Sequence, residues 1–184
     1  MTSDYIAELS TLPQSTPADV EAFNPFVHQY RTSGDDAEQQ LSSSYFLACV
    51  ALRRLLNRVH DLLYAAKGGV AFDDARYPQM VAELDRQLEA WRECLPAAFH
   101  FTVDTQEVSN EHGGFLRQRY LTCRAVIYRP YLNHALGQHQ AGTTVTPYVH
   151  EKAEVCLRMG LLHMQNLRAF GQTVLVDTWI CALS

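Results

Sequence analysis

Apolar side chains recur at every third or fourth residue in several segments after residue 41, and this spacing is the strongest constraint on the fold. It gathers apolar residues on one face of an α-helix, whereas a half-buried strand needs alternation at every second residue. The sequence contains no sustained alternation of that kind. It therefore predicts an all-α fold, an antiparallel or orthogonal bundle of about five main helices, incomplete at the C-terminal end.

Proline, glycine and threonine set the expected helix ends. Pro78 suits a first helical turn, Thr146 can cap the helix that begins at Pro147, and Gly171 follows its end. Residues 97–113 are expected to form a loop that closes at the glycine pair 113–114. The helices are expected at residues 42–66, 78–94, 115–132 and 147–170, with a fifth beginning near Val174.

Residues 1–40 differ in composition from the rest. They are rich in Ser, Thr, Pro, Asp and Gln, and Pro13, Pro17 and Pro25 exclude a long helix there. The expected organisation is a linker or irregular segment over 1–40, followed by a partial helical domain over 41–184.

The charge balance argues against a free-standing nucleic-acid binder, because the net charge is −5 and the pI is about 5.9. The five cysteines include no closely spaced pair of the kind that holds structural zinc. The start lacks the basic and apolar runs of a signal peptide, and no apolar stretch is long enough to span a membrane. We therefore expect a soluble intracellular protein that makes no membrane contact.

The stretch "FLRQRYLTCRAVIYRPYL", residues 115–132, carries four arginines on a helix that is apolar on most sides. A helix that reads a DNA groove gathers its cations on one face, whereas this one disperses them. We expect Arg117 and Arg124 to point inward and to pair with carboxylates of a neighbouring helix, with Asp85 and Glu89 as the candidates. Pro130 lacks the backbone N–H that would bond to Val126, so a kink or a break is expected there.

The first helix offers a smaller polar group. Arg54, Arg58 and Asp61 flank its apolar stripe, and the spacing of Arg58 and Asp61 makes a local ion pair available.

No local pattern supports a catalytic or metal site. "HEKAE" at His150 lacks the second histidine of a zinc-protease helix, and Asp73–Asp74 lack the carboxylate one turn later that a metal–diphosphate site needs. We assign no catalytic residue and no metal ligand. The alternative function is an all-α, metal-dependent enzyme of fungal secondary metabolism, of the terpenoid type.

Three segments occur in an order that carries a family resemblance. They are "YFLACVALRRLLNRVHDLLY" (45–64), "ELDRQLEAWRECLPAAFHF" (83–101) and "LRQRYLTCRAVIYRPYL" (116–132). Together they resemble the fungal-specific domain, or middle homology region, of fungal zinc-cluster transcription factors, and the resemblance covers about residues 41–184.

The resemblance implies a nuclear regulatory domain that controls RNA polymerase II transcription through intramolecular, homodimer or co-regulator contacts, and that can sense a small-molecule effector. In that family DNA is bound by an N-terminal zinc cluster, and no such cysteine cluster is present in this sequence. We therefore expect no cofactor in this chain and DNA contact only through a module that is absent here. The expected chain is a fragment, a truncated gene model or a regulator that has lost its DNA-binding module.

Overall fold

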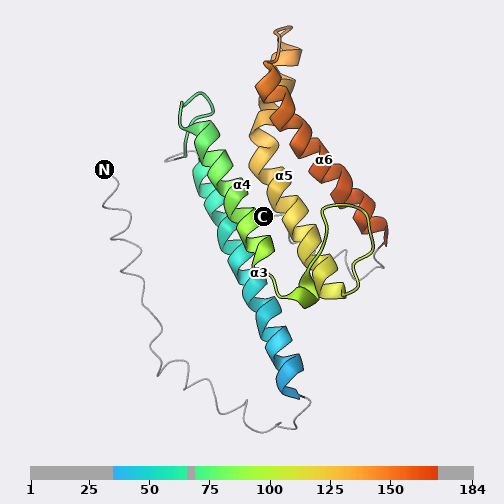
Figure 1. Ribbon diagram of the computed structural model, residues 1–184. Coiled ribbons are helices and arrows are strands. Elements are labelled where there is room, and N and C mark those ends of the chain that lie inside the picture. Colours follow the sequence, from blue (N-terminus) through green and yellow to red (C-terminus); the bar gives the residue numbers. More distant parts are fainter. Residues whose placement is uncertain (1–34, 66–68, 170–184) are drawn as a thin grey trace, which may run out of the picture. The chain divides into compact units, whose positions relative to one another are not determined.

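The structure, a computed structural model, describes residues 35–65 and 69–169, and all its regular elements are helical (Figure 1). Contacts divide the chain between Ser42 and Ser43, and the packing described below is that of the unit beginning at Ser43. The helices are α3 (Asp35–Leu63), α4 (Tyr77–Glu93), the short 3-10 helix η1 (Ala97–Phe99), α5 (Glu111–Gln140) and α6 (Pro147–Ala169). Within these residues the predicted all-α class is confirmed.

Side-chain contacts give the direction of each helix. The indole Nε1 of Trp91 on α4 donates to the carbonyl of Ala48 on α3 at 3.0 Å, and Arg58 Nη1 donates to Gln87 Oε1 at 2.7 Å. Ala48 precedes Arg58 on α3, but its partner Trp91 follows Gln87, the partner of Arg58, on α4. These two helices are therefore antiparallel, which a connection of about a dozen residues allows.

Helix α5 lies between α4 and α6 (Figure 1). Thr122 contacts His163, with 3.4 Å between Oγ1 and Nδ1, and Tyr131 contacts Tyr148 with 3.5 Å between the hydroxyls. Earlier residues of α5 thus meet later residues of α6. The two helices are antiparallel, so consecutive helices alternate in direction.

The core follows the predicted apolar stripes, but α5 contributes to it on most of its surface. On α3 and α4 the buried positions recur at three- or four-residue spacing, as expected for amphipathic helices. On α5 most residues between Gly113 and Tyr128 are buried, without a clear exposed face. The buried apolar residues of these three helices are Ala48, Leu52, Leu55, Leu56, Val59, Tyr77, Val81, Leu84, Leu88, Leu116, Tyr120, Leu121, Cys123, Val126, Ile127, Tyr128 and Tyr131.

Three predicted helix boundaries are wrong: α5 ends at Gln140 rather than at residue 132, and two helices begin earlier than expected. Helix α3 begins at Asp35 rather than at residue 42, and α5 begins at Glu111, so that the glycine pair 113–114 lies inside its first turns. Asn110 caps α5 by accepting a hydrogen bond from the backbone N–H of His112 at 2.8 Å. The glycines reflect close packing rather than a helix end.

Gly113 shows what that packing requires. A Cβ at this position would lie 3.0 Å from Val108 Cγ1 and 3.2 Å from the carbonyl oxygen of Phe99. Both distances are tighter than most Cβ contacts, so a side chain at this position would require Val108 or Phe99 to shift by a few tenths of an ångström. The expected fifth helix from Val174 lies outside the described residues.

Pro130 does not break α5, which continues to Gln140. Proline leaves the carbonyl of the residue four positions earlier without its helical partner. That carbonyl belongs to Val126, and the Tyr64 hydroxyl at the end of α3 donates to it at 2.5 Å. Burial raises the pKa of Tyr64 to about 12, so the hydroxyl keeps its proton at neutral pH. The side chain of Tyr64, the residue that follows α3, therefore replaces the missing backbone donor.

This replacement predicts coupling between Tyr64 and Pro130. Tyr64→Phe should destabilise the wild type by about 1–2 kcal/mol, because the Val126 carbonyl loses its donor. In a Pro130→Ala background the backbone N–H of residue 130 can bond to that carbonyl, so the same substitution should cost much less. Urea denaturation of the four proteins of this double-mutant cycle measures the coupling. Equal costs in both backgrounds would contradict the replacement.

Candidate functional site

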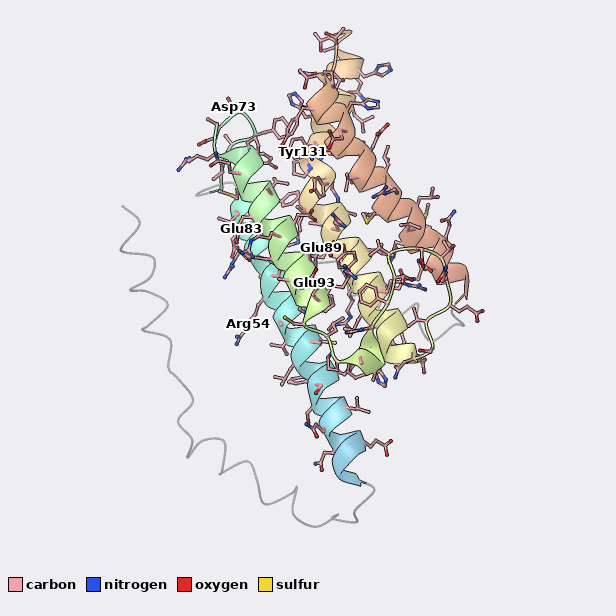
Figure 2. The ribbon with its side chains drawn as sticks, in the orientation of Figure 1. Arg54, Asp73, Glu83, Glu89, Glu93 and Tyr131 are labelled. Atoms are coloured by element: carbon pink, nitrogen blue, oxygen red, sulfur yellow. The ribbon has the colours of Figure 1, made fainter. Side chains whose placement is uncertain are left out.

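The most connected polar cluster in the described residues lies between α4 and α5. Asp85 and Glu89 are one helical turn apart on α4, beside the buried Leu84 and Leu88. This spacing places both carboxylates on the side of α4 that faces α5, as Figure 2 shows for Glu89. Burial of Leu84 and Leu88 in the core therefore also determines that the side chains of Asp85 and Glu89 point towards α5.

Arg124 of α5 contacts both carboxylates. Its Nη2 donates to Asp85 Oδ2 at 3.0 Å and its Nη1 donates to Glu89 Oε1 at 2.9 Å. Its Nε also lies 2.9 Å from Asp85 Oδ1, at an angle that makes the contact ionic rather than a hydrogen bond. The Arg124 side chain is 20% exposed and that of Asp85 is 17% exposed. The pairing expected from the sequence is present.

Two tyrosines of α5 complete the cluster. Tyr120 donates its hydroxyl proton to Glu89 and accepts a hydrogen bond from Arg124 Nη1 at 2.7 Å. Tyr128 donates to Asp85 Oδ2 at 3.0 Å. Burial first, and then the hydrogen bonds to the carboxylates, raise the pKa of both phenols. Both hydroxyls therefore stay protonated and act as donors.

Glu89 and Arg124 are held in their ionised forms by their neighbours in the cluster. Burial by itself would raise the pKa of Glu89, but hydrogen bonds from Tyr120 and Arg92 and the charge of Arg124 lower it overall. Burial by itself would lower the pKa of Arg124, but Asp85, Tyr120 and Glu89 raise it overall. Charges that are removed from water need such compensation. The carboxylates of Asp85 and Glu89 on α4 accept hydrogen bonds from side chains of α5. The cluster therefore joins α4 to α5.

Arg117 does not pair with Asp85 or Glu89, and that part of the prediction is wrong. Its side chain is only 2% exposed, and its Nη1 donates to the backbone carbonyl of Gln106 at 2.5 Å. The carboxylate nearest to Nη1 is Asp104, at 3.9 Å. Helix α4 ends at Glu93 and runs antiparallel to α5, so the part of α5 that carries Arg117 lies beyond the end of α4. That part of α5 contacts the loop between η1 and α5 instead.

The loop that Arg117 contacts is also held by α6. Asn166, which is buried, donates to the backbone carbonyl of Asp104 at 2.9 Å. Inside the loop, Asp104 accepts hydrogen bonds from the Thr102 hydroxyl and the Gln106 backbone N–H. Asn166 was not predicted from the sequence, although its place one helical turn after His163 on the same face of α6 was an available signal for a buried polar contact.

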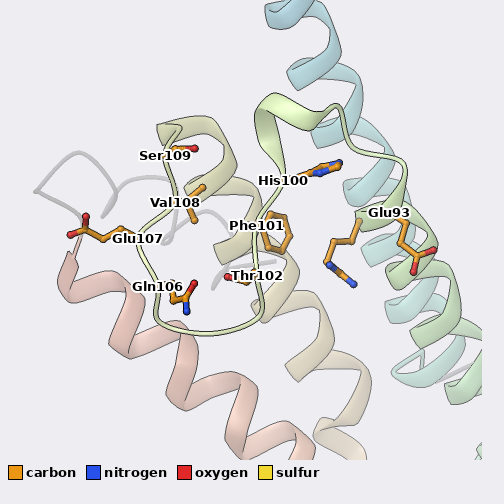
Figure 3. Close-up of a pocket in the computed structure, with 9 residues that line it drawn as sticks. Glu93, His100, Phe101, Thr102, Gln106, Glu107, Val108 and Ser109 are labelled. Atoms are coloured by element: carbon orange, nitrogen blue, oxygen red, sulfur yellow. The ribbon is translucent and has the colours of Figure 1, made fainter.

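Beside this loop lies an open hollow of about 570 Å³ (Figure 3). Phe101 and Val108 give it an apolar part, and polar side chains surround them. The remaining lining residues are Arg92, Glu93, His100, Thr102, Gln106, Glu107 and Ser109. Its volume is in the range of small-molecule sites. Binding of a small effector stays a prediction.

The arginines of α5 differ in exposure. Arg117 is buried, Arg119 and Arg124 are half-buried, and Arg129 is exposed. A groove-reading helix needs several cations on one solvent face. Helix α5 does not present its arginines in that way, in agreement with the dispersion seen in the sequence.

The structure does not bring together the three polar residues predicted to interact on α3, which are Arg54, Arg58 and Asp61. Arg58 donates to Gln87, and within the residues that the structure describes it forms no ion pair with Asp61. Antiparallel α4 supplies a partner that the local spacing could not show. Arg54 is exposed on α3, where Figure 2 labels it.

The aspartate pair before α4 has a structural contact. Asp74 accepts hydrogen bonds from the backbone N–H of Arg76 at 2.8 Å and from its Nη2 at 2.7 Å. The hydrogen bonds from Arg76 lower the pKa of Asp74 to about 2. Over residues 35–65 and 69–169 no group of three or more His, Cys, Asp or Glu side chains is placed to hold a metal ion. No helix in the same ranges is both long and apolar enough to cross a bilayer.

Comparison with known proteins gives one informative similarity. Over 108 residues the chain is 31% identical to the protein named "Putative transcription factor ecdB" of Aspergillus rugulosus, a match that covers 54% of this chain. The match covers 19% of that protein, so the chain corresponds to about a fifth of its length. No family model and no solved structure matches the chain. Over about half of its length the chain is therefore similar to a protein whose name is that of a transcription factor.

The cluster between α4 and α5 predicts that Arg124→Ala lowers the free energy of unfolding by about 2–3 kcal/mol, because two partly buried carboxylates lose their cation. Arg86→Ala is the matched control. Arg86 pairs with Glu83 at 2.7 Å, but its side chain is 67% exposed, so its removal should cost much less than that of Arg124. Chemical denaturation compares the two variants, and equal losses would contradict a stabilising role for the Arg124 cluster.

The lowered pKa of Glu89 predicts acid sensitivity. Because the folded pKa lies below the ordinary value of 4.5, the ionised form stabilises the fold. This stabilisation is complete above pH 4.5 and is lost as the pH falls through the folded pKa. Glu89→Gln should reduce stability at neutral pH and weaken its fall on acidification, as measured by thermal melts. Hydrogen bonds from Arg86 and Gln87 lower the pKa of Glu83 to about 2, but water screens this exposed pair, so Glu83→Gln should change the acid profile less than Glu89→Gln does.

Proposed function

We propose that residues 41–184 form a regulatory region of a fungal transcription factor, the middle homology region found in zinc-cluster factors. The observation that carries the proposal is the 31% identity over 108 residues to an Aspergillus rugulosus protein named as a transcription factor. The three ordered segments between residues 45 and 132 support the finer family. The region acts in the nucleus, on transcription by RNA polymerase II.

The positions of the α5 arginines support a regulatory role over a DNA-reading role. Arg124 is occupied by Asp85 and Glu89, and Arg117 is occupied by the Gln106 carbonyl. A net charge of −5 also disfavours binding to a polyanion. In this proposal the contact with DNA is made by a zinc-cluster module outside these 184 residues, and this chain acts through protein partners or a homodimer.

A tethering experiment tests the proposal. The 184-residue chain is fused to an unrelated DNA-binding domain and assayed on a reporter gene that carries the matching site. The fusion should change reporter transcription relative to the DNA-binding domain alone, upward for an activator and downward for a repressor. No change at equal protein levels and nuclear location would count against a regulatory function.

Two variants make this experiment specific. Arg124→Ala should reduce the effect of the fusion in proportion to its loss of stability, and Arg86→Ala should preserve the effect. In a separate binding assay the chain without the fusion should show no salt-sensitive binding to duplex DNA. Tight binding there would show that the chain itself contacts DNA.

A further inference from the structure

Helix α6 packs on α5 with one side, where Cys156 and Met159 are buried (Figure 1). On its solvent side Leu157, Leu161 and Met164 are each more than half exposed. These three residues recur at four- and three-residue spacing, so they form one apolar stripe along the helix, called here the α6 stripe. Contiguous exposed apolar side chains are typical of interaction surfaces.

Gly160 lies beside the α6 stripe, three residues after Leu157 and four before Met164. A Cβ at this position would meet no atom of the described residues within 4 Å, so their packing does not require a glycine here. Glycine destabilises the interior of a helix relative to alanine. What a glycine allows at such a place is the close approach of another backbone, since the distance between two helices depends on the side chains at their contact.

The α6 stripe has nearly the same pattern in both directions from Leu161. Leu157 lies four residues before it and Met164 three residues after it. Glu154 stands seven residues before Leu161, and the sequence has Arg168 seven residues after it. Seven residues are close to two helical turns, so both positions lie on the face of Leu161. A second α6 turned antiparallel about this centre therefore brings apolar positions onto apolar positions, and the acidic end onto the basic end.

We propose that the α6 stripe is the contact surface of a homodimer, in which α6 packs antiparallel on α6 of a second copy. The two-fold axis passes beside Gly160 and Leu161, so that Leu161 of each copy lies against Gly160 of the other. The same surface is used on both copies, and such a contact closes as a dimer. Because one helix of each copy forms it, the interface is small, and the dimer should dissociate on dilution.

This inference rests on the homodimer named under the proposed function, to which it assigns a surface. Its test measures the mass of the protein in solution, whereas the tethering experiment measures transcription. The chain can therefore change reporter transcription without forming this dimer, or form the dimer without changing transcription, and the two failures are distinguishable.

Sedimentation equilibrium of the full 184-residue chain over a concentration series tests the dimer. The average mass of the wild type should rise with concentration from that of one chain to that of two. Leu161→Lys places two like charges beside the axis and should keep the protein monomeric. Leu136→Lys is the matched control, because Leu136 lies on α5 and both leucines are 52% exposed, so the dimer should persist.

Four results would overturn the proposal. A wild type that stays monomeric at every concentration would leave the α6 stripe to a different partner, and a dimer that survives Leu161→Lys would place the contact elsewhere. Masses above that of two chains would exclude a closed two-fold contact. Equal loss of the dimer in Leu136→Lys would show that the effect is not specific to the stripe.

A pair of glycine variants separates the contact from an effect on folding. Gly160→Ala should raise the melting temperature of the dilute, monomeric protein, because alanine favours the helix, yet weaken dimerisation several-fold, because its Cβ separates the two helices. Gly137→Ala on α5, where a Cβ also meets no atom of the described residues within 4 Å, should raise the melting temperature and leave dimerisation unchanged. Full dimerisation of Gly160→Ala would overturn the close approach.

A charge exchange tests the antiparallel direction. Glu154→Arg and Arg168→Glu should each weaken the dimer several-fold, because each brings like charges together at both ends of the contact. The variant that combines the two substitutions should dimerise as the wild type does. Strictly additive losses, without restoration, would overturn the antiparallel arrangement.

Discussion

The ion-pair cluster of Arg124 with Asp85 and Glu89 is the interaction on which the arrangement of α4 and α5 depends. It joins the two helices at the middle of their contact, where Leu84 and Leu88 enter the core. Apolar burial would hold the helices together in several registers, whereas a cation between two carboxylates satisfies all three charges in one register. The cluster thus contributes specificity as well as stability.

The same principle extends along α5, because this helix is surrounded by other elements on most sides. A buried helix must satisfy every polar group from its neighbours. The Val126 carbonyl obtains a donor from Tyr64, which follows α3, and the Ala125 carbonyl accepts a weaker hydrogen bond from the Cys156 thiol of α6 at 3.3 Å. Contacts from both sides therefore support the stretch of α5 just before Pro130, which is where a proline weakens a helix.

The sequence predicted most of this fold and part of the cluster. Apolar spacing was enough to place Leu52 and Leu56 in the core, because the helical period is a local property. The pairing of Arg124 followed from its place on an apolar arc, since a buried cation requires an anion. The partner of Arg117 did not follow, because the Gln106 carbonyl belongs to a loop whose path is not encoded in any local period. Sequence reasoning could identify the need for a partner, but it could not identify which backbone atom the fold would supply.

The sequence by itself determined the helical class, the inward direction of Arg124 and the loss of one backbone hydrogen bond at Pro130. Each of these depends on the geometry of a single helix or on the chemistry of a single residue. Only the tertiary structure decided that α5 would continue through Pro130 and that Arg117 would hold the loop before α5. The physical reason is that a missing donor or a buried charge can be satisfied by any chain segment that packing brings within hydrogen-bond distance, and packing is a property of the whole domain.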